Sequence, residues 1–458
     1  MTRRKLALGA FLHPSGHHVA AWRHPDARHD AGINLRNYIR LARVAEAAKF
    51  DLVFLADQIA VPSANLDYVS RTTRATYFEP LTLISALAAA TETIGLVATV
   101  STSFNSPYNL ARYFASLDQI SGGRAGWNLV TSGSTLEGEN FGSGEGYYNH
   151  ANRYRQAAEF ADLVRGLWDT FDEGAVLDDR ASGQYLDARK VHALGHAGEF
   201  FRVKGPLSVP RSAQGQPVLV QAGSSDAGRD LAARSAEVIF TAQPTLAQAQ
   251  EFYGDVKTRA RAYGRDPESI RILPGVFPVV GRSEEEAREK FQTLQDLVSP
   301  EVGREYLSIH LGGIDLSAYG DSDPVPQIEV SGRGHVSRPL LLLQKARERN
   351  LTIRELYLEI AGARGHWQIV GTPQSIADEL EAYFTQGGAD GFNIMPPSPT
   401  GLDDFVELVL PELRRRGLVR DDYEARTLRG HLGLTPPENR FAAAAKGQFH
   451  PHTEKESA

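Results

Sequence analysis

The chain has 458 residues and a formal net charge of −7, with 42% hydrophobic and 23% charged residues. These proportions are ordinary for a globular protein with a large core, and the negative charge argues against nucleic acid as the main partner. Because the chain contains no cysteine, disulfide bonds, thiolate catalysis and cysteine-ligated metal sites are excluded.

The N-terminal segment carries basic residues ahead of the short apolar run Lys5–Phe11. This run is too short for a secretory signal and lacks a small-residue cleavage pattern, so we interpret it as the first core strand. No stretch of 18 apolar residues is present, so no membrane-spanning helix is predicted. We therefore expect a cytoplasmic protein.

Apolar runs of strand length alternate with helical patterns, such as Asn34–Lys49 and Glu79–Thr91. Most of the runs are continuous, which is typical of parallel strands covered on both faces. The predicted strands are Leu6–Phe11, Leu52–Ala56, Gly95–Ser101, Ala125–Val130, Pro217–Ala222, Val238–Thr241, Ile272–Val280 and Phe392–Met395. Eight strands in βα order favour a (β/α)₈ TIM barrel with insertions. A doubly wound open sheet is the alternative, although no early GxGxxG turn supports it.

Three segments exceed what a barrel requires: 13–34, 131–148 and 283–390. The third separates the last two predicted strands and contains a predicted helix, Leu340–Asn350. Long excursions on a barrel usually cover its catalytic mouth, so we expect the third segment to act as a lid. We predict one domain over residues 1–432 and a C-terminal tail, 433–458, that is poorly ordered or wraps a neighbouring molecule.

The segment Ser121–Ser132, SGGRAGWNLVTS, ends a helix, turns, and then ends a buried strand in polar residues. Gly122-Gly123 stops the preceding helical pattern. Asn128, Thr131 and Ser132 lie near or just past the end of the strand and have little apolar surface to bury. A core strand that ends in such residues usually opens into a site.

The longer segment Thr99–Ser132, TVSTSFNSPYNLARYFASLDQISGGRAGWNLVTS, resembles flavin-dependent monooxygenases of the nitrilotriacetate and dibenzothiophene-sulfone monooxygenase group. That group belongs to the bacterial luciferase-like superfamily. The resemblance implies a two-component system, in which a separate NAD(P)H-dependent flavin reductase supplies FMNH₂. It further implies that this chain reacts FMNH₂ with O₂, protects the C4a-(hydro)peroxyflavin from water, and oxidises a small organic substrate. The oxidation would cleave a C–N or C–S bond or oxidise a sulfur atom. The resemblance also implies that the chain forms a homodimer or homotetramer.

Polar residues at the strand ends are the first candidates for a flavin site. Asp57 ends the second strand, where a carboxylate points into the mouth of a barrel, or where it caps the following turn. The hydroxyls of Ser101, Thr102 and Ser103 can donate to a flat heterocycle or to local backbone groups. Asn128 offers a donor and an acceptor, or serves as a structural amide. The resemblance implies flavin contacts for Asp57, for Thr102 with Ser103 in reserve, and for Asn128.

His150 and Tyr154 are four residues apart in the predicted helix Asn149–Phe160 and share one face of it. A histidine at the start of a helix is otherwise a cap or a core residue. The resemblance implies that this pair reaches the ribityl-phosphate side of FMN.

The chain leaves the fifth strand through Gly223 and enters a helix at Ser224-Ser225. Free N–H groups at a helix start can bind an anion, whereas Ser225 alone can also be a simple N-cap. The resemblance implies that Ser224 and Ser225 hold the FMN phosphate. Asp226 brings a negative charge to this place, and Arg229 one turn later is positioned to offset it.

The segment His17–Arg23, HHVAAWR, resembles the first active-site loop of the same family. The resemblance implies that Trp22 stacks on flavin or substrate and that His17, His18 and Arg23 contact an anionic substrate. The histidines of this region have no compact ligand spacing, so we predict no metal site.

The GSGEG sequence of Gly142–Gly146 is not GxGxxG and follows no strand, so we interpret it as a loop and not as a dinucleotide cradle. The sequence therefore has no nicotinamide signature.

Four functions remain open at this point. An FMNH₂-dependent monooxygenase is the first, and a deazaflavin-dependent hydride-transfer enzyme of the same superfamily is the second. The third is a non-catalytic flavin-binding protein. The fourth is a hydrolase with paired carboxylates, for which Asp57 has no evident partner. Nothing in the sequence selects the organic substrate or an obligatory acid or base.

Overall fold

The computed structural model describes residues 4–142, 150–326 and 337–445. Its centre is a closed barrel of eight parallel strands, because each strand pairs with the next and the last pairs with the first. The barrel strands are β1 (Ala7–Phe11), β2 (Leu52–Leu55), β3 (Gly95–Ser101), β4 (Ala125–Val130), β9 (Val218–Gln221), β10 (Val238–Thr241), β11 (Arg271–Val280) and β13 (Gly391–Ile394). The predicted TIM barrel is confirmed, and each predicted strand bound is correct to within one residue.

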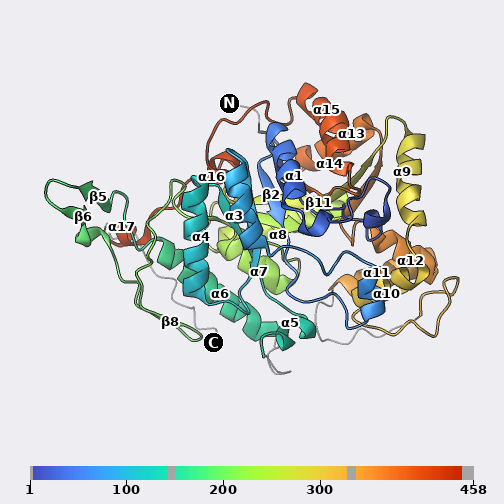
Figure 1. Ribbon diagram of the computed structural model, residues 1–458, viewed down its shortest axis with the longest axis horizontal. Helices are drawn as coiled ribbons and strands as arrows, with labels where there is room; N and C mark the ends of the chain where they lie inside the picture. The colour runs from blue at the N-terminus through green and yellow to red at the C-terminus, as the bar shows by residue number, and fades with distance from the viewer. Residues whose placement is uncertain (1–3, 143–149, 327–336, 446–458) are drawn as a thin grey trace.

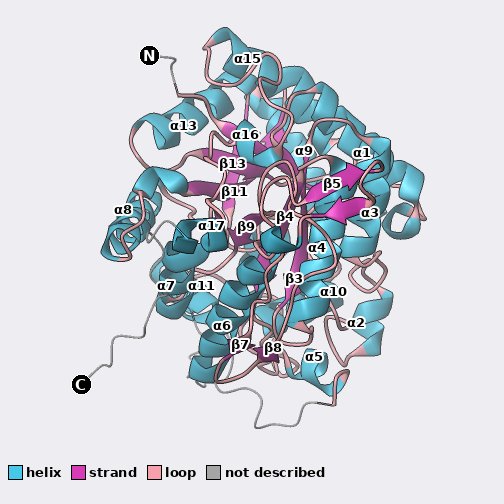
Figure 2. Cartoon of the chain, turned by 90° about the vertical axis from the view of Figure 1, so that its left-hand side faces the viewer, coloured by secondary structure: helices cyan, strands magenta, loops and turns pink. Residues whose placement is uncertain are grey.

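Helices surround the barrel (Figures 1 and 2). Those that follow the strands of the sheet are α1 (Leu35–Ala47), α3 (Pro80–Ala90), α4 (Pro107–Ser121), α6 (His150–Trp168), α7 (Asp226–Ser235), α8 (Leu246–Ala262), α13 (Pro373–Thr385), α14 (Gly401–Asp404) and α15 (Leu410–Arg415). The shorter ones are α2 (Leu66–Ser70), α5 (Thr135–Glu139), α16 (Leu428–His431) and α17 (Arg440–Ala445). Side chains cap the two helices predicted in the first hundred residues, because Asn34 accepts from the backbone of α1 and Glu79 from that of α3.

Leucine side chains fill the N-terminal end of the barrel. Leu428 of α16 is fully buried and packs with the apolar side chains inside the strands. A Cβ at Gly95 would lie 2.4 Å from one methyl carbon of Leu428, and a Cβ at Gly126 would lie 3.1 Å from the other. Glycine at these two positions therefore makes room for the Leu428 side chain. Because this end of the barrel is filled, a binding site is expected at the other end, where the strands have their carboxyl ends.

The long segment between β11 and β13 folds around a hydrophobic cluster of its own, at the right of Figure 1. Its helices are α9 (Glu284–Asp296), α10 (Pro300–His310), α11 (Ser337–Arg349) and α12 (Ile353–Ala361). The predicted helix Leu340–Asn350 corresponds to α11. Val19, from the loop after β1, and Tyr68 of α2 complete the cluster, so this helical unit is packed onto the rim of the barrel.

A ninth strand, β12 (Trp367–Gly371), pairs with the C-terminal half of β11 and was not predicted. Its middle residues are only partly buried, since it lies outside the closed barrel. The five-residue run gave no clear strand signal because it stands between two helical patterns.

Residues 169–217 form a fourth excursion that the sequence analysis missed. It contains two short hairpins, β5–β6 (Val176–Asp179 with Gln184–Leu186) and β7–β8 (His196–Ala197 with Arg202–Val203). Figure 1 shows the first hairpin projecting at the left of the molecule, and all its strand residues are exposed. Exposed strands this short lack the apolar pattern from which strands are predicted.

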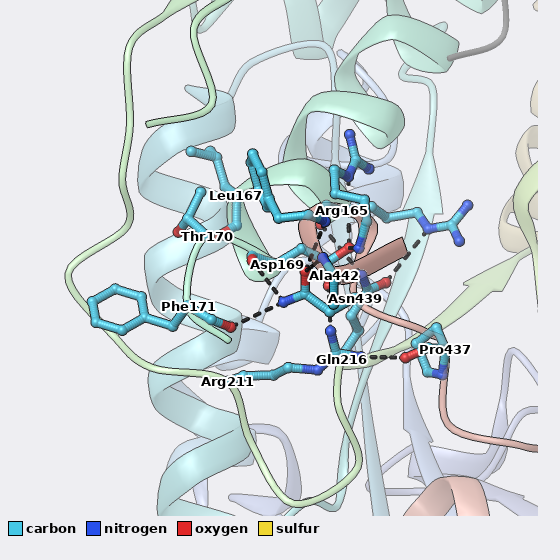
Figure 3. Close-up of polar contacts among 12 residues, drawn as sticks. Arg165, Leu167, Asp169, Thr170, Phe171, Arg211, Gln216, Pro437, Asn439 and Ala442 are labelled. Atoms are coloured by element: carbon cyan, nitrogen blue, oxygen red, sulfur yellow. Dashed lines mark hydrogen bonds and ion pairs between the residues drawn. The ribbon is translucent and has the colours of Figure 1, made fainter. Parts of the chain in front are cut away.

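The described part of the predicted tail, up to Ala445, packs on the body of the chain (Figure 3). Asn439 donates from Nδ2 to the carbonyl oxygens of Asp169, at 2.8 Å, and Phe171, at 3.0 Å. Arg211 bridges the Asp169 carboxylate, at 2.8 Å, and the carbonyl of Pro437. The expectation of a poorly ordered tail is therefore wrong for this part, because side chains far apart in the sequence anchor it. Residues 446–458 lie outside the described residues.

The Asn439→Ala substitution should lower the free energy of unfolding by about 2 kcal/mol, because it leaves two backbone carbonyls without their donor. Urea denaturation followed by circular dichroism measures this change. Thr435→Ala removes an exposed side chain from the same segment and should alter stability by less than about 0.5 kcal/mol. Equal stability of the two variants would contradict the anchoring role of Asn439.

Candidate active site at the carboxyl ends of the strands

The ends of β3 and β4 are joined by a network of hydroxyl groups. The hydroxyls of Ser101 and Ser132 lie 2.8 Å apart, and the Ser103 hydroxyl accepts from the Ser132 N–H at 3.1 Å. Arg153 of α6 donates to the Ser132 carbonyl. The Thr102 hydroxyl donates to the Val130 carbonyl at 3.2 Å, which is the local backbone role that we stated as its alternative. Its predicted flavin contact stays a prediction, as does that of Ser103.

Helices α6 and α7 meet at the same rim through two of the predicted residues. The hydroxyls of Tyr154 and Ser225 lie 3.2 Å apart. Ser225 is also the N-cap of α7 and accepts from the Gly228 N–H at 3.2 Å, while the exposed Ser224 lies 3.4 Å from Thr241 Oγ1. Tyr154, Ser224 and Ser225 are therefore brought together. His150 is the first residue of α6, but its side chain lies outside the described part of the chain.

The positive charge that offsets Asp226 comes from another helix than we expected. Arg259 of α8 pairs with the exposed Asp226 carboxylate at 2.5 Å. Arg229 instead pairs with Asp255 of α8 at 3.0 Å and donates to the Ser224 carbonyl. The prediction for Arg229 is therefore wrong, because α8 carries both a carboxylate that attracts Arg229 and a guanidinium that reaches Asp226.

Asn128 is buried on the inner side of β4, where its Nδ2 donates to Thr99 Oγ1 at 2.8 Å. Within the described residues its Oδ1 has no hydrogen-bond partner. A buried amide oxygen without a donor is costly, so a bound group that donates a hydrogen bond would stabilise it. This atom fits the edge of a flavin ring, which carries an N–H donor.

Asp57 lies past the end of β2 and accepts from the N–H of Gln58 at 2.8 Å. It caps no helix, since α2 begins later and is capped by Asn65. The pKa of Asp57 is raised to about 6, chiefly by burial and to a smaller extent by the neighbouring carboxylates Glu79 and Glu137. A carboxyl group with a raised pKa at the mouth of a barrel is typical of a functional site.

His17 is fully buried beside the end of β1. Arg364 donates to its Nδ1 at 2.6 Å, so its Nε2 carries the proton and donates to the Phe11 carbonyl at 2.9 Å. Burial, followed by the positive charge of Arg364, lowers the pKa of His17 well below its ordinary value. The ring is therefore neutral, and in the described structure both nitrogens contact protein atoms.

The rest of the His17–Arg23 loop connects the rim to the helical unit. His18 contacts Gln295 of α9 at 3.1 Å, and burial lowers the pKa of His18 to about 4. Arg23 donates to the carbonyl of Leu297, just beyond α9. Trp22 is 37% exposed. The substrate contacts predicted for these residues remain predictions, and the contacts described here attach the loop to α9.

Two arginines at this rim were not singled out from the sequence. Arg74 is 8% exposed and donates to His13 Nε2 at 3.1 Å and to the His17 carbonyl at 2.8 Å. Arg364 reaches the ring of the same His17. Both arginines lie in irregular segments between other elements, so no local pattern marks them, and only folding brings them to β1.

The described residues hold neither a membrane-spanning helix nor a metal-binding cluster. No helix among them is long and apolar enough to cross a bilayer. In the same residues, no three His, Asp or Glu side chains are grouped so as to hold a metal ion. The Gly142–Gly146 loop lies almost entirely outside the described ranges.

Known proteins resemble this chain over nearly all its length. The model of the luciferase-like monooxygenase family matches residues 15–391. The N-acetyl-S-(2-succino)cysteine monooxygenase of Bacillus subtilis is 49% identical over 96% of this chain and 99% of its own. Nitrilotriacetate monooxygenase component A of Aminobacter aminovorans is 46% identical over 96% of this chain and 98% of its own. The crystal structure of DmoA from Hyphomicrobium sulfonivorans matches with a TM-score of 0.86 at 30% identity, over 97% of this chain and 96% of that one.

The Asp57→Asn substitution should stabilise the protein above pH 6. Because the pKa of the folded state is raised to about 6 from 3.8, the ionised carboxylate opposes folding, and stability rises as the pH falls through that range. Since Asp57 is partly exposed, we expect a gain of about 1 kcal/mol at pH 8, which disappears below about pH 4. Thermal unfolding at several pH values measures it. The Asp67→Asn substitution, at an exposed carboxylate, is the control. If stability depends on pH in the same way in both variants, the raised pKa of Asp57 is refuted.

Proposed function

The chain belongs to the luciferase-like monooxygenase family, and from that premise we propose that it is the oxygenating component of a two-component system. It takes reduced FMN from a separate NAD(P)H-dependent reductase and uses O₂ to oxidise a small organic molecule. The relatives at 46% and 49% identity are named monooxygenases, which favours oxygen transfer over hydride transfer or a non-catalytic role.

One observation carries the assignment of the site. Residues that the sequence proposes for the flavin come from β3, β4, α6 and α7, and helix α6 contacts both groups of strand-end residues. Its Arg153 donates to the carbonyl of Ser132, whose hydroxyl pairs with that of Ser101, and the next residue, Tyr154, contacts Ser225 at the start of α7. This continuity supports a single ligand that extends from the ends of β3 and β4 to the N-terminus of α7.

The residues at this rim fit FMN. The start of α7 suits a phosphate, because its first N–H groups are free of helical partners and its dipole favours an anion. The unpaired amide oxygen of Asn128 suits the ring edge. When bound, reduced FMN supplies the reaction with O₂ that transfers one oxygen atom to the substrate. We assign His150, Tyr154, Ser224 and Ser225 to the phosphate side, and Asp57, Thr102 with Ser103 in reserve, and Asn128 to the ring side.

The helical unit of α9 to α12 serves in this proposal to exclude water from the rim. Its cluster includes Val19 from the loop after β1 and Tyr68 of α2, and His18 is hydrogen-bonded to Gln295 of α9. Exclusion of water protects reactive flavin chemistry from hydrolysis and proton leakage.

We further propose that the chain works in the cytoplasm as a homodimer or homotetramer. The projecting β5–β6 hairpin supports self-association, since Val176, Leu177 and Tyr185 are 40%, 44% and 63% exposed. The separate reductase is supported by the name of the Aminobacter aminovorans relative, which is called component A.

The direct test supplies the purified chain with reductase-generated FMNH₂ and ¹⁸O₂. Thioethers, sulfones and aminocarboxylates are screened by mass spectrometry. A product that contains one ¹⁸O atom supports the proposal. If the chain exchanges hydride with a deazaflavin and forms no oxygenated product from any substrate, the oxygenase proposal is refuted and a hydride-transfer function is supported.

The Ser225→Ala and Tyr154→Phe substitutions should each weaken the binding of reduced FMN about tenfold, because each removes a hydroxyl group assigned to the phosphate side. Anaerobic fluorescence titration measures the affinity. Thr245→Ala is the matched control, since Thr245 caps α8 as Ser225 caps α7 and its loss affects only helix stability. Wild-type affinity in both site variants would count against the assignment.

A further inference from the structure

We propose that Thr99 and Asn128 make the flavin site select reduced over oxidised FMN. The inference rests on the proposed function, because it assigns the choice of the cofactor's redox state to two residues of the same site. Thr99 belongs to β3 and Asn128 to β4, and the two are direct neighbours in the pairing of these strands. Thr99 was not singled out from the sequence, because threonine is common inside strands.

The side chain of Asn128 points to the inside of the barrel. Its neighbour Trp127 packs outward, with its ring 6.0 Å from that of Phe114 of α4. Successive side chains of a strand point to opposite faces, so Asn128 faces the interior. Gly126 lies on the same side of β4 and makes room for Leu428. Asn128 therefore lies one layer nearer to the carboxyl ends of the strands than the side chain that fills the opposite end.

Thr99 orients the amide group of Asn128. Asn128 Nδ2 donates to Thr99 Oγ1 at 2.8 Å, and the two residues are only 2% and 4% exposed. Asn128 Oδ1 is buried and has no hydrogen-bond partner among the described residues. Because Thr99 holds the nitrogen, the oxygen is the atom of this amide that is left for a ligand, and it can only accept a hydrogen bond.

Reduction changes the hydrogen-bonding groups of a flavin ring. The oxidised ring has its N–H group at N3, and its N5 atom is an acceptor. On reduction N5 gains a proton and becomes a donor. A buried acceptor without a partner is costly, and a hydrogen bond to it recovers that cost. Asn128 Oδ1 therefore stabilises the reduced ring through N5–H and opposes the oxidised ring, whose N5 is also an acceptor.

The neighbours of Asn128 in the barrel favour contact with N5 over contact with N3. The N3–H group lies between two carbonyl groups of the ring, so a site for that edge needs a donor on each side of the acceptor. Val220 of β9, which pairs with Asn128 on one side, is buried and apolar and donates nothing. A lone acceptor suits N5–H, which has a ring carbonyl on one side and a C–H group on the other.

Selection of reduced FMN suits a protein that takes its cofactor from a separate reductase. Oxidised FMN is left when the reaction is complete, and it competes for the same site. A preference is a difference between two affinities, and it is strengthened when the unwanted ligand meets an unpaired polar group. The unpaired oxygen of Asn128 has this effect on oxidised FMN, so it favours the exchange of oxidised for reduced cofactor.

The test compares the two redox states of FMN on one preparation of the protein. Fluorescence titration measures the affinity for oxidised FMN in air and for reduced FMN under anaerobic conditions, and we expect the wild-type protein to bind reduced FMN more tightly. Asn128→Leu should weaken the binding of reduced FMN about tenfold and leave that of oxidised FMN unchanged or tighter. A tenfold loss of preference lowers the midpoint potential of the bound two-electron couple by about 30 mV.

Variants of Thr99 test its role in orienting the amide. Thr99→Val keeps the shape of the side chain without the hydroxyl and should lower the preference about threefold, whereas Thr99→Ser should keep it. Thr258→Val makes the same replacement on the exposed face of α8, where the hydroxyl donates to the Gly254 carbonyl, and should change nothing. Because each preference is a ratio of two affinities of one variant, a partly unfolded fraction cancels, and circular dichroism confirms folding.

Three outcomes would overturn the inference while leaving the proposed function intact. The first is equal weakening of both forms by Asn128→Leu, because N3–H, which both forms carry, would then be the donor. The second is a wild-type preference in Asn128→Leu. The third is a wild-type preference in Thr99→Val, since Thr99 would then not orient the amide. If the wild-type protein binds neither form of FMN, the proposed function and the inference fail together.

Discussion

The closure of the parallel barrel is the constraint on which the rest of the structure depends. When β13 pairs with β1 and β10 with β11, every ladder hydrogen bond finds a partner and no strand edge is left in the ring. All strands then end at the same rim. Leu428 fills the opposite end, so the polar residues that follow β2, β3, β4 and β9 face a common mouth.

Burial divides the rim into two electrostatic regions. On the side of β2, Asp57 lies near Glu79 and Glu137, and its pKa is raised because burial and like charges disfavour the ionised form. Beside β1, Arg74 and Arg364 surround two neutral histidines. The rim therefore presents a carboxyl group with a raised pKa past the end of β2 and two guanidinium groups beside the end of β1.

The insertions complete the site because they share contacts with the barrel loops. The cluster of α10 to α12 includes Val19 and Tyr68, and α9 is hydrogen-bonded to His18. The loop after β1 therefore cannot move independently of the helical unit. The C-terminal segment acts elsewhere, since Asn439 fixes it to the chain that follows α6, away from the ends of the strands.

The sequence by itself determined the barrel, the bounds of its strands and the family, because continuous apolar runs, helix stops and the Thr99–Ser132 segment are local signals. It also predicted which strand ends would carry polar side chains, among them Ser103, Asn128 and Ser225. Only the tertiary structure decided which groups meet. Arg74 and Arg364 are 290 positions apart in the sequence yet contact the same histidine, and Arg259, not Arg229, pairs with Asp226. Long side chains from separate elements form such contacts, and their partners are set by how the elements pack, which no local pattern records.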